Sequence, residues 1–233
     1  MKRTALIFCL LLPVFALYAR GIQEDVNLAE EKAQTSYAFG LIIGSDFRNA
    51  GLELDYAAFA DGLREWMEKG SGKYTQDEAL SLVQAALEAA SAKKAEENRL
   101  KELQFLAENG ERPDVRGVPS GLQYEVLSEG SGAKPGENDV VRVHYEGSLT
   151  DGTVFDSSIE RGEPAELPLD QVIPGWSEGL RLMSVGSKYR LYIPSELAYG
   201  PRGAGQIIPP YSTLIFTVEL LEILGFEEEE SGE

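Results

Sequence analysis

The amino-acid sequence predicts an α+β protein in which an all-α N-terminal domain precedes a domain built on an antiparallel sheet. Residues 22–110 contain no proline and few β-branched residues, which favours helices. After Gly110, prolines appear at Pro113 and Pro119, and apolar residues recur at every second position, which is typical of strands. At 233 residues the chain is long enough for two domains of modest size.

The first 21 residues have the pattern of a signal peptide. Lys2 and Arg3 precede an uncharged run over residues 5–18, and small residues follow at Ala19 and Gly21. The run of about 14 residues is shorter than the ~20 apolar residues that span a bilayer. We therefore expect an exported protein, cleaved after Ala19 or Gly21 and located in the periplasm, at the outer membrane or at the cell surface. The alternative is an uncleaved amphipathic anchor.

Charge and cysteine content exclude several classes of function. The formal charge is −18, and loss of the signal peptide would leave 18 basic against 39 acidic residues. Such an excess of acidic residues argues against binding of nucleic acid or anionic lipid. The only cysteine, Cys9, lies in the signal peptide, and His144 is the only histidine. These two residues cannot supply a zinc site of the usual Cys/His kind, and we expect no metal and no cofactor.

Two short helices are expected first in the mature chain. One covers about Leu28–Asn49 and ends at Gly51, and Asp55 is the expected N-cap of the other, which ends near Gly70. Roughly 45 residues are too few to bury their large aromatic side chains. We therefore expect residues 22–74 to be a helical dimerisation domain that pairs two copies of the chain, whereas in the alternative it packs on the C-terminal domain of a monomer. The aromatic side chains concerned are Phe39, Phe47, Phe59 and Trp66.

A third, long helix is expected over residues 75–110. It opens with Thr75 and Glu78, which are spaced as in a capping box, and runs to about Asn109. At about 1.5 Å per residue it is roughly 50 Å long. Because half of it is polar on all sides, we interpret it as a connecting helix between two bodies.

The C-terminal domain is expected over residues 111–225, with one short helix near Trp176–Met183. The tail, residues 226–233, is acidic and has no assigned function. No phosphate-binding loop is present, since the glycine-rich residues 200–205 lack the Lys-Ser/Thr ending. The expected strands are Leu122–Ser128, Val140–Leu149, Ser187–Pro194 and Thr213–Leu224.

Five short segments in this domain combine aromatic residues with turn residues, in a fixed order. They are Val143-His144-Tyr145-Glu146-Gly147, Gly152-Thr153-Val154-Phe155-Asp156-Ser157-Ser158, Gln171-Val172-Ile173-Pro174-Gly175-Trp176, Ala198-Tyr199-Gly200 and Ile207-Ile208-Pro209-Pro210. Together they resemble the signature segments of FKBP-type peptidyl-prolyl cis/trans isomerases over Gly117–Leu224. The preceding helices, with Ser36-Tyr37-Ala38-Phe39-Gly40, resemble the dimerisation module of the Mip-like (macrophage infectivity potentiator) branch of that family.

The resemblance implies a half-barrel sheet wrapped on a short helix, with an apolar pit between them. It implies that the Ile173 N–H and the Tyr199 hydroxyl donate hydrogen bonds to substrate, and that Asp156 lies beside the rotating amide or only orients neighbouring Tyr or Arg groups. His144 is expected at a partly exposed strand position. The catalytic set implied is Asp156, Tyr199, Phe155, Ile173 and Trp176, with Trp176 as the floor of the pit. The substrate-binding set is Tyr145, Val172, Ile207, Ile208 and Phe216, with the two isoleucines as a flap.

The function implied is cis/trans isomerisation of X–Pro bonds in exported proteins, combined with chaperone activity. The resemblance also implies binding of macrolide inhibitors. Three positions depart from the best-known single-domain members: Gln171, Ala165 and Ala204. They lie on the wall and flap that shape substrate preference and inhibitor affinity. The alternative function is a non-catalytic chaperone or binding module that uses the helical cleft.

Overall fold

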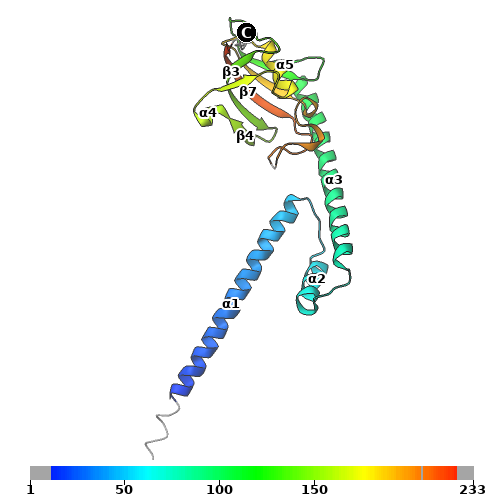
Figure 1. Cartoon of the computed structure of the whole chain (residues 1–233), viewed down its shortest axis with the longest axis vertical. Helices are drawn as coiled ribbons and strands as arrows, with labels where there is room; N and C mark the ends of the chain where they lie inside the picture. The colour runs from blue at the N-terminus through cyan, green and yellow to red at the C-terminus, as the bar shows by residue number, and fades with distance from the viewer. Residues whose placement is uncertain (1–11, 206, 225–233) are drawn as a thin grey trace, which may run out of the picture. The chain divides into compact units, whose positions relative to one another are not determined.

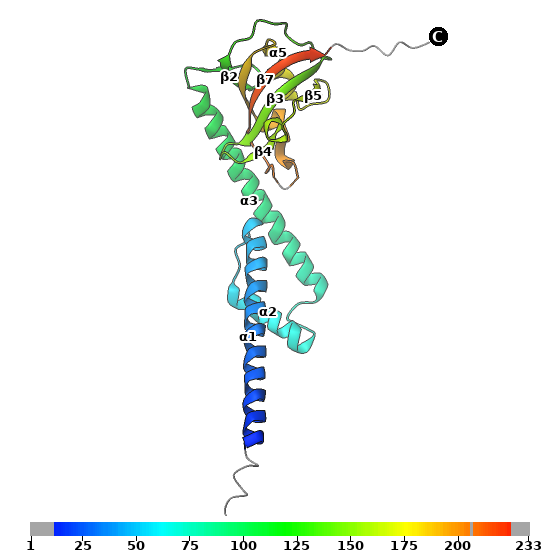
Figure 2. The same ribbon diagram turned by 90° about the vertical axis from the view of Figure 1, so that its left-hand side faces the viewer.

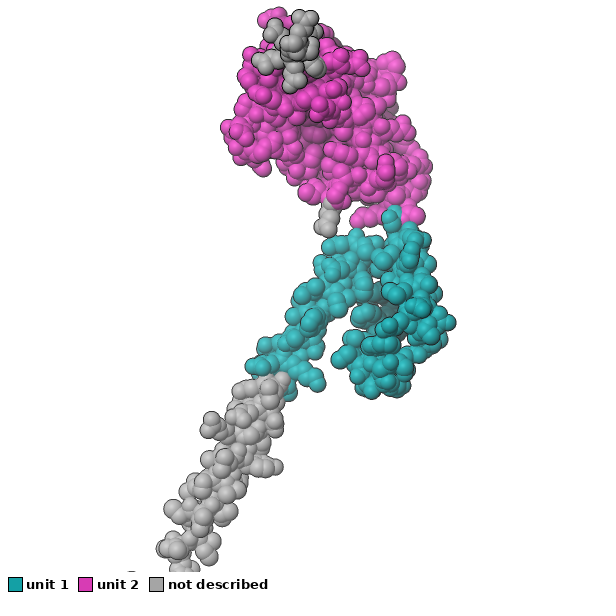
Figure 3. All heavy atoms as spheres, in the orientation of Figure 1, with its two compact units in different colours: residues 1–91 teal, residues 92–233 magenta. Residues whose placement is uncertain are grey.

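A computed structural model describes residues 12–205 and 207–224, and their side chains from residue 29 onward (Figures 1 and 2). Residues 1–11 of the predicted signal peptide, with Cys9, and the acidic tail lie outside the described residues. The chain divides into two compact units, residues 1–91 and 92–233, coloured separately in Figure 3. Within the described residues, no helix combines the length and the apolar character needed to cross a membrane.

The first unit is helical. Its second and third helices begin at the expected capping residues, whereas its first helix begins at Leu12 rather than near Leu28. Helix α1 covers Leu12–Asn49, α2 covers Tyr56–Lys69, and α3, Gln76–Gly110, begins in this unit. The Asp55 carboxylate accepts hydrogen bonds from two N–H groups of the first turn of α2, and Gly70 ends the helix in the left-handed conformation. At the start of α3, Thr75 and Glu78 form the reciprocal hydrogen bonds of a capping box.

The second unit is built on one antiparallel seven-stranded sheet in the order β1-β2-β6-β7-β3-β4, with β5 also paired to β3. Its two long strands, β3 and β7, pair along their whole length and form the middle of the sheet. The α+β class and the antiparallel half-barrel are therefore confirmed. The strands are β1 (Val115–Gly117), β2 (Gln123–Ser128), β3 (Val140–Leu149), β4 (Val154–Ser157), β5 (Ala165–Pro168), β6 (Lys188–Ile193) and β7 (Leu214–Leu224).

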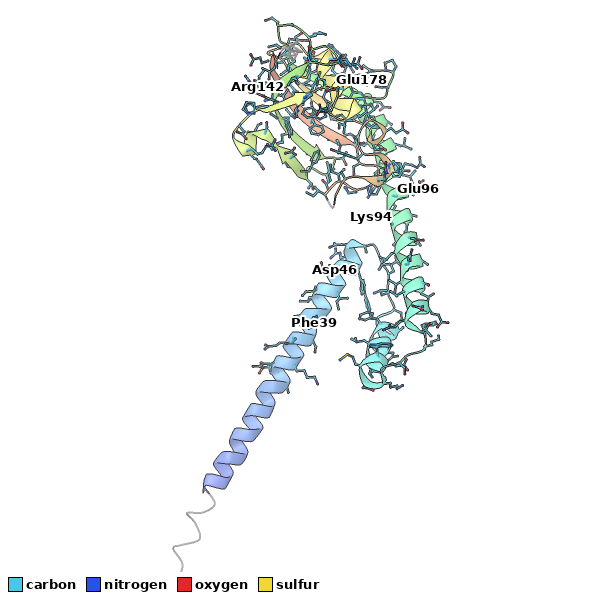
Figure 4. All side chains as sticks on the ribbon, viewed as in Figure 1. Phe39, Asp46, Lys94, Glu96, Arg142 and Glu178 are labelled. Carbon is cyan, nitrogen blue, oxygen red and sulfur yellow. The ribbon has the colours of Figure 1, made fainter. Side chains whose placement is uncertain are left out.

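The core lies between one face of this sheet and the short helix α5, Pro174–Leu182. Figures 1 and 2 show α5 beside the sheet. Buried and partly buried residues alternate along most of β3 and β7, as the period of two requires. Gly179 permits the close approach of α5, since a Cβ at that position would lie 2.5 Å from Leu191 Cδ1. At the exposed edge of the unit, the Ser120 hydroxyl donates to Glu178 of α5, which is labelled in Figure 4.

The second half of α3 packs against the sheet domain rather than standing apart from it. The side chains of Glu102 and Asn109 are buried, and Asn109 Nδ2 donates to Gln123 Oε1 at 2.8 Å. The Phe105 ring lies 6.1 Å, centroid to centroid, from the ring of Tyr192 on β6. The sequence-based interpretation of this stretch as a connecting helix did not anticipate these contacts, because its two buried residues, Glu102 and Asn109, are polar.

The four expected strands are confirmed to within one residue, but several short elements were not expected. These are β1, β4, β5, the single-turn helix α4 (Ser158–Arg161) and two 3₁₀ turns, η1 (Ser195–Leu197) and η2 (Gly200–Arg202). Elements of three or four residues contain too little periodicity to be recognised in a sequence. They matter here because β4 and β5 contribute residues to the lining of the pit.

Candidate active site

An apolar pit of about 430 Å³ opens between α5 and the sheet. Its lining comes from seven separate parts of the sequence, which the half-barrel brings to one place. The lining residues are Tyr145, Phe155, Asp156, Leu167, Gln171, Val172, Ile173, Trp176, Tyr199, Ile208 and Phe216.

The floor of the pit is Trp176, in the first turn of α5. Pro174 occupies the first helical position, where the missing N–H costs no hydrogen bond. Gly175 lets this turn approach β6, because a Cβ there would lie 2.3 Å from Ile193 Cγ2. The indole is 4% exposed, and its Nε1 has no hydrogen-bond partner among the described residues.

The walls of the pit are aromatic rings held edge to face. Phe216 on β7 is the common member: its centroid lies 4.9 Å from that of Trp176 and 5.5 Å from that of Phe155, at interplanar angles of 89° and 86°. Tyr145 on β3 lies 5.1 Å from Trp176 at 88°. Edge-to-face pairs of this kind hold each ring in a fixed orientation. The pit therefore has a rigid, mainly apolar surface.

A glycine on β3 makes room for two of these rings. A Cβ at Gly147 would lie 2.6 Å from Phe216 and 2.8 Å from Phe155, closer than carbon atoms pack. Glycine at this position is therefore required by the rings rather than by a turn.

A charged triad, Asp156, Tyr145 and Arg161, borders the apolar pit. The Tyr145 hydroxyl donates to Asp156 Oδ2, Arg161 Nη1 donates to Asp156 Oδ1, and Arg161 Nη2 lies 2.9 Å from the Tyr145 oxygen. Burial by itself raises the pKa of Asp156, but the hydrogen bonds from Tyr145 and Arg161 and the guanidinium charge outweigh it, so this pKa lies below its ordinary value. Burial and the hydrogen bond to Asp156 raise the pKa of Tyr145. The acid is thus ionised and the phenol protonated.

Two of the residues that line the pit carry candidate hydrogen-bond donors. Ile173 is the N-cap residue of α5, and N–H groups at this end of a helix have no partner within the helix. Tyr199 lines the pit while remaining 42% exposed, so its hydroxyl is accessible to solvent and ligand.

Nine of the ten residues that the sequence singled out line this pit. The exception is Ile207, which is 58% exposed and does not line the pit, whereas the adjacent Ile208 is buried and lines it. His144 is half-buried on β3, and its Nδ1 lies 3.1 Å from Ser158 Oγ.

Sequence reasoning missed Leu167 and Arg161. Leu167 lies on β5, too short a strand to be recognised, and Arg161 lies on the single-turn helix α4. The only feature of the sequence that pointed to Arg161 was its position, five residues after Asp156. Gln171 was noted as a departure from a family pattern, and it lines the pit.

Comparisons with known proteins agree on one family. The family model described as "FKBP-type peptidyl-prolyl cis-trans isomerase" matches residues 131–221, and that described as "Domain amino terminal to FKBP-type peptidyl-prolyl isomerase" matches residues 32–126. The "FKBP-type 22 kDa peptidyl-prolyl cis-trans isomerase" of Escherichia coli K12 is 47% identical over 83% of this chain and 96% of its own.

Two further relatives cover most of the chain. The "Outer membrane protein MIP" of Legionella longbeachae is 40% identical over 88% of this chain and 91% of its own. Among solved structures, the crystal structure of FkpA from Escherichia coli has a TM-score of 0.65 and 36% identity, and the match covers 82% of this chain and 95% of that one.

Proposed function

The chain belongs to the family of FKBP-type peptidyl-prolyl cis-trans isomerases and is such an enzyme, and we propose that it rotates X–Pro bonds in the pit above Trp176. The observation that carries this assignment is the rigid aromatic surface formed by Tyr145, Phe155, Trp176 and Phe216. A proline ring is apolar and compact, and it matches a pit of this size and character.

An apolar pit favours rotation for a simple electrostatic reason. The rotation barrier of an amide is about 18–20 kcal/mol and reflects the loss of resonance. The twisted amide has less charge separation than the planar one, so removing water favours the twisted state relative to the planar one. Lowering the barrier by about 5 kcal/mol would raise the rate by nearly four decades. No nucleophile or proton transfer is needed.

The polar groups at the border hold the substrate in register. We assign the Ile173 N–H and the Tyr199 hydroxyl as donors to the carbonyl groups that flank the proline. Asp156 holds the Tyr145 hydroxyl and Arg161 in place, and it lines the pit in which the amide rotates. Ile208 covers the pit, with Ile207 as the outer part of the flap, and Val172 completes the wall.

The assignment is tested by the rate of cis-to-trans conversion of a short X–Pro peptide. We expect Tyr199→Phe to lower kcat/KM roughly fivefold, the loss expected for one hydrogen bond of about 1 kcal/mol. Tyr74→Phe, in the first unit, is the matched control and should leave the rate unchanged. Equal rates for Tyr199→Phe and the wild type, with both proteins folded, would exclude the proposed role of Tyr199.

A homodimer through the first unit is the second part of the proposal. No described side chain between residues 29 and 91 is buried, although many are large and apolar. Phe39, labelled in Figure 4, is 61% exposed, and Trp66 is 45% exposed. Isolated helices with such faces are unstable in water, and a second copy is the occupant that supplies the same apolar chemistry.

Light scattering on residues 22–233 tests the dimer. We expect twice the mass of one chain for the wild type, and dissociation for a Phe39→Ser, Trp66→Ser double variant. Leu127→Ser, which removes an exposed leucine from β2, is the control and should stay dimeric. A wild-type protein that is monomeric at micromolar concentration would contradict the proposed homodimer.

Export is the third part, and it rests on residues 1–21. We propose that the mature enzyme acts on proline-containing proteins of the cell envelope, that it also binds them as a chaperone, and that macrolide inhibitors compete for the same pit. N-terminal sequencing of the protein from a periplasmic extract should give Arg20 or Ile22 as the first residue. An intact Met1 in that extract would contradict cleavage.

A further inference from the structure

The segment of residues 195–213, which we call the flap segment, joins β6 to β7 and carries Tyr199 and Ile208 to the pit. Within the segment, backbone hydrogen bonds join Ala198 to Ser195, Gly203 and Tyr211 to Gly200, and Ala204 to Ile208, and the Ser212 hydroxyl donates to the Pro209 carbonyl. It contains three glycines with positive φ, and Tyr211 adopts a φ of 56°. These bonds join residues within the segment, so its position relative to the sheet also depends on how its ends are held.

One carboxylate of α3 holds both ends of the flap segment. Glu102 Oε2 accepts from the Ser195 hydroxyl at 2.8 Å, and Glu102 Oε1 accepts from the Ser195 N–H at 2.5 Å and from the Thr213 hydroxyl at 3.5 Å. Ser195 is the first residue of the segment and Thr213 the last. The side chains of Glu102, Ser195 and Thr213 are all buried. The hydrogen bonds from Ser195 and Thr213 therefore replace those that the Glu102 carboxylate would make with water.

A second contact from the same face of α3 reaches the returning arm of the segment. Asn98 Nδ2 donates to the Pro210 carbonyl at 3.0 Å, and Asn98 and Glu102 are four residues apart, hence neighbours on one helix face. In Figure 1 the segment, drawn in orange, lies beside the green half of α3. The helix therefore contacts the segment at its start, on its return and at its end.

We propose that Glu102 and Asn98 are positioning residues of the isomerase, which set the positions of Tyr199 and Ile208 over the pit by fixing the ends of the flap segment. The inference rests on the proposed function, because it assumes that Tyr199 and Ile208 act on the substrate. Neither Glu102 nor Asn98 lines the pit, so both act only through the segment.

Loss of the contacts between α3 and the flap segment should change kcat and KM, which a loss of stability alone would not do. The floor and walls, formed by residues of β3, β4, β7 and α5, bind the proline ring without help from α3. Releasing the segment leaves this binding in place and weakens the contacts of Tyr199 and Ile208, so kcat falls more than KM rises. A contact that served stability alone would change neither constant below the unfolding temperature.

Four variants of the whole chain test the proposal, assayed with an X–Pro peptide well below every Tm. Glu102→Ala should lower kcat/KM at least roughly fivefold, mainly in kcat, as expected for the loss of a charge-assisted hydrogen bond. Glu102→Gln keeps an oxygen for the Ser195 N–H and should stay within about twofold of the wild type. Asn98→Ala should show a smaller loss in the same direction.

The matched control is Asn109→Ala, which breaks a buried contact of α3 with β2 and does not touch the flap segment. It should lower Tm as Glu102→Ala does and leave kcat/KM within about twofold. Equal kinetics for Glu102→Ala and Asn109→Ala would overturn the proposal. Tyr199→Phe and Ile208→Ala are measured beside them: if both match the wild type, the site assignment is wrong and the inference falls with it. If they are impaired while Glu102→Ala is not, only the positioning role is wrong.

Discussion

The hydroxyl of Tyr145 donates a hydrogen bond to Asp156 Oδ2, and this bond joins the apolar wall of the pit to the charged group at its border. Arg161 completes the arrangement by donating to both residues. The carboxylate therefore has two structural partners before any substrate binds. This arrangement supports an orienting role for Asp156. Substitutions that keep or remove the hydrogen-bond acceptor can distinguish this role from direct electrostatic assistance.

Asp156→Asn and Asp156→Ala distinguish the two roles. Asparagine keeps an oxygen that accepts from Tyr145 but has no charge, whereas alanine removes the acceptor. If orientation is the main role, kcat/KM should fall about tenfold for alanine and no more than about threefold for asparagine, since half-exposed polar contacts contribute about 1 kcal/mol. Equal losses for both variants would instead assign the effect to the charge. The rate constants come from the peptide assay.

The pKa of Asp156 predicts how stability depends on pH. Its folded-state pKa lies below the ordinary 3.8, so its contribution is complete above the unfolded-state pKa and is lost as pH falls through the folded-state pKa. The difference in unfolding free energy between the wild type and Asp156→Asn should be constant from about pH 7 to 5 and shrink below about pH 4. Since both partners are more than a third exposed, the full difference should be on the order of 0.5 kcal/mol.

Urea unfolding at several pH values measures this difference. Taking the difference between the two proteins cancels the titration of the many other acidic groups. A difference that grows as the pH falls would contradict the assigned direction of the shift.

Gly147→Ala tests the packing of the aromatic walls. The added Cβ would meet Phe216 and Phe155 below van der Waals distance, so the rings must shift into the pit. We expect a loss of about 1–3 kcal/mol of stability together with lower isomerase activity. Gly117→Ala in β1 is the control, since nothing lies within 4 Å of the added atom, and its effect should stay within about 0.5 kcal/mol. Thermal unfolding and the peptide assay measure both quantities.

The point at which the sheet domain is separated from the helices should decide its stability. A chain that begins at residue 92 keeps the buried contacts of Asn98, Glu102 and Asn109, whereas a chain that begins at residue 111 loses them. At about 1 kcal/mol for each of these five hydrogen bonds, the shorter chain should be less stable by roughly 5 kcal/mol. The midpoints of denaturant unfolding measure this difference in stability, provided that the two curves have the same slope of free energy against denaturant concentration. Equal midpoints would show that α3 contributes nothing to the stability of the sheet domain.

Local patterns in the sequence were sufficient for the elements that have strong signals. Asp55, Gly70 and the Thr75–Glu78 pair predicted the helix boundaries because capping is a contact between near neighbours in the chain. The period-two alternation predicted β3 and β7 because both are long and buried on one face. The short elements β4, β5 and α4 have no such signal.

For the pit, too, the sequence determines some features and only the tertiary structure decides others. The sequence by itself determined its aromatic composition, and the ordered motifs indicated which residues belong together. Only the tertiary structure decided that Ile208 rather than Ile207 lines it, that Arg161 pairs with Asp156, and that a buried carboxylate on α3 closes the base of the flap segment. The physical reason is that Glu102 is 93 residues from Ser195 in the chain, and two polar residues so far apart have no shared periodicity to reveal their contact.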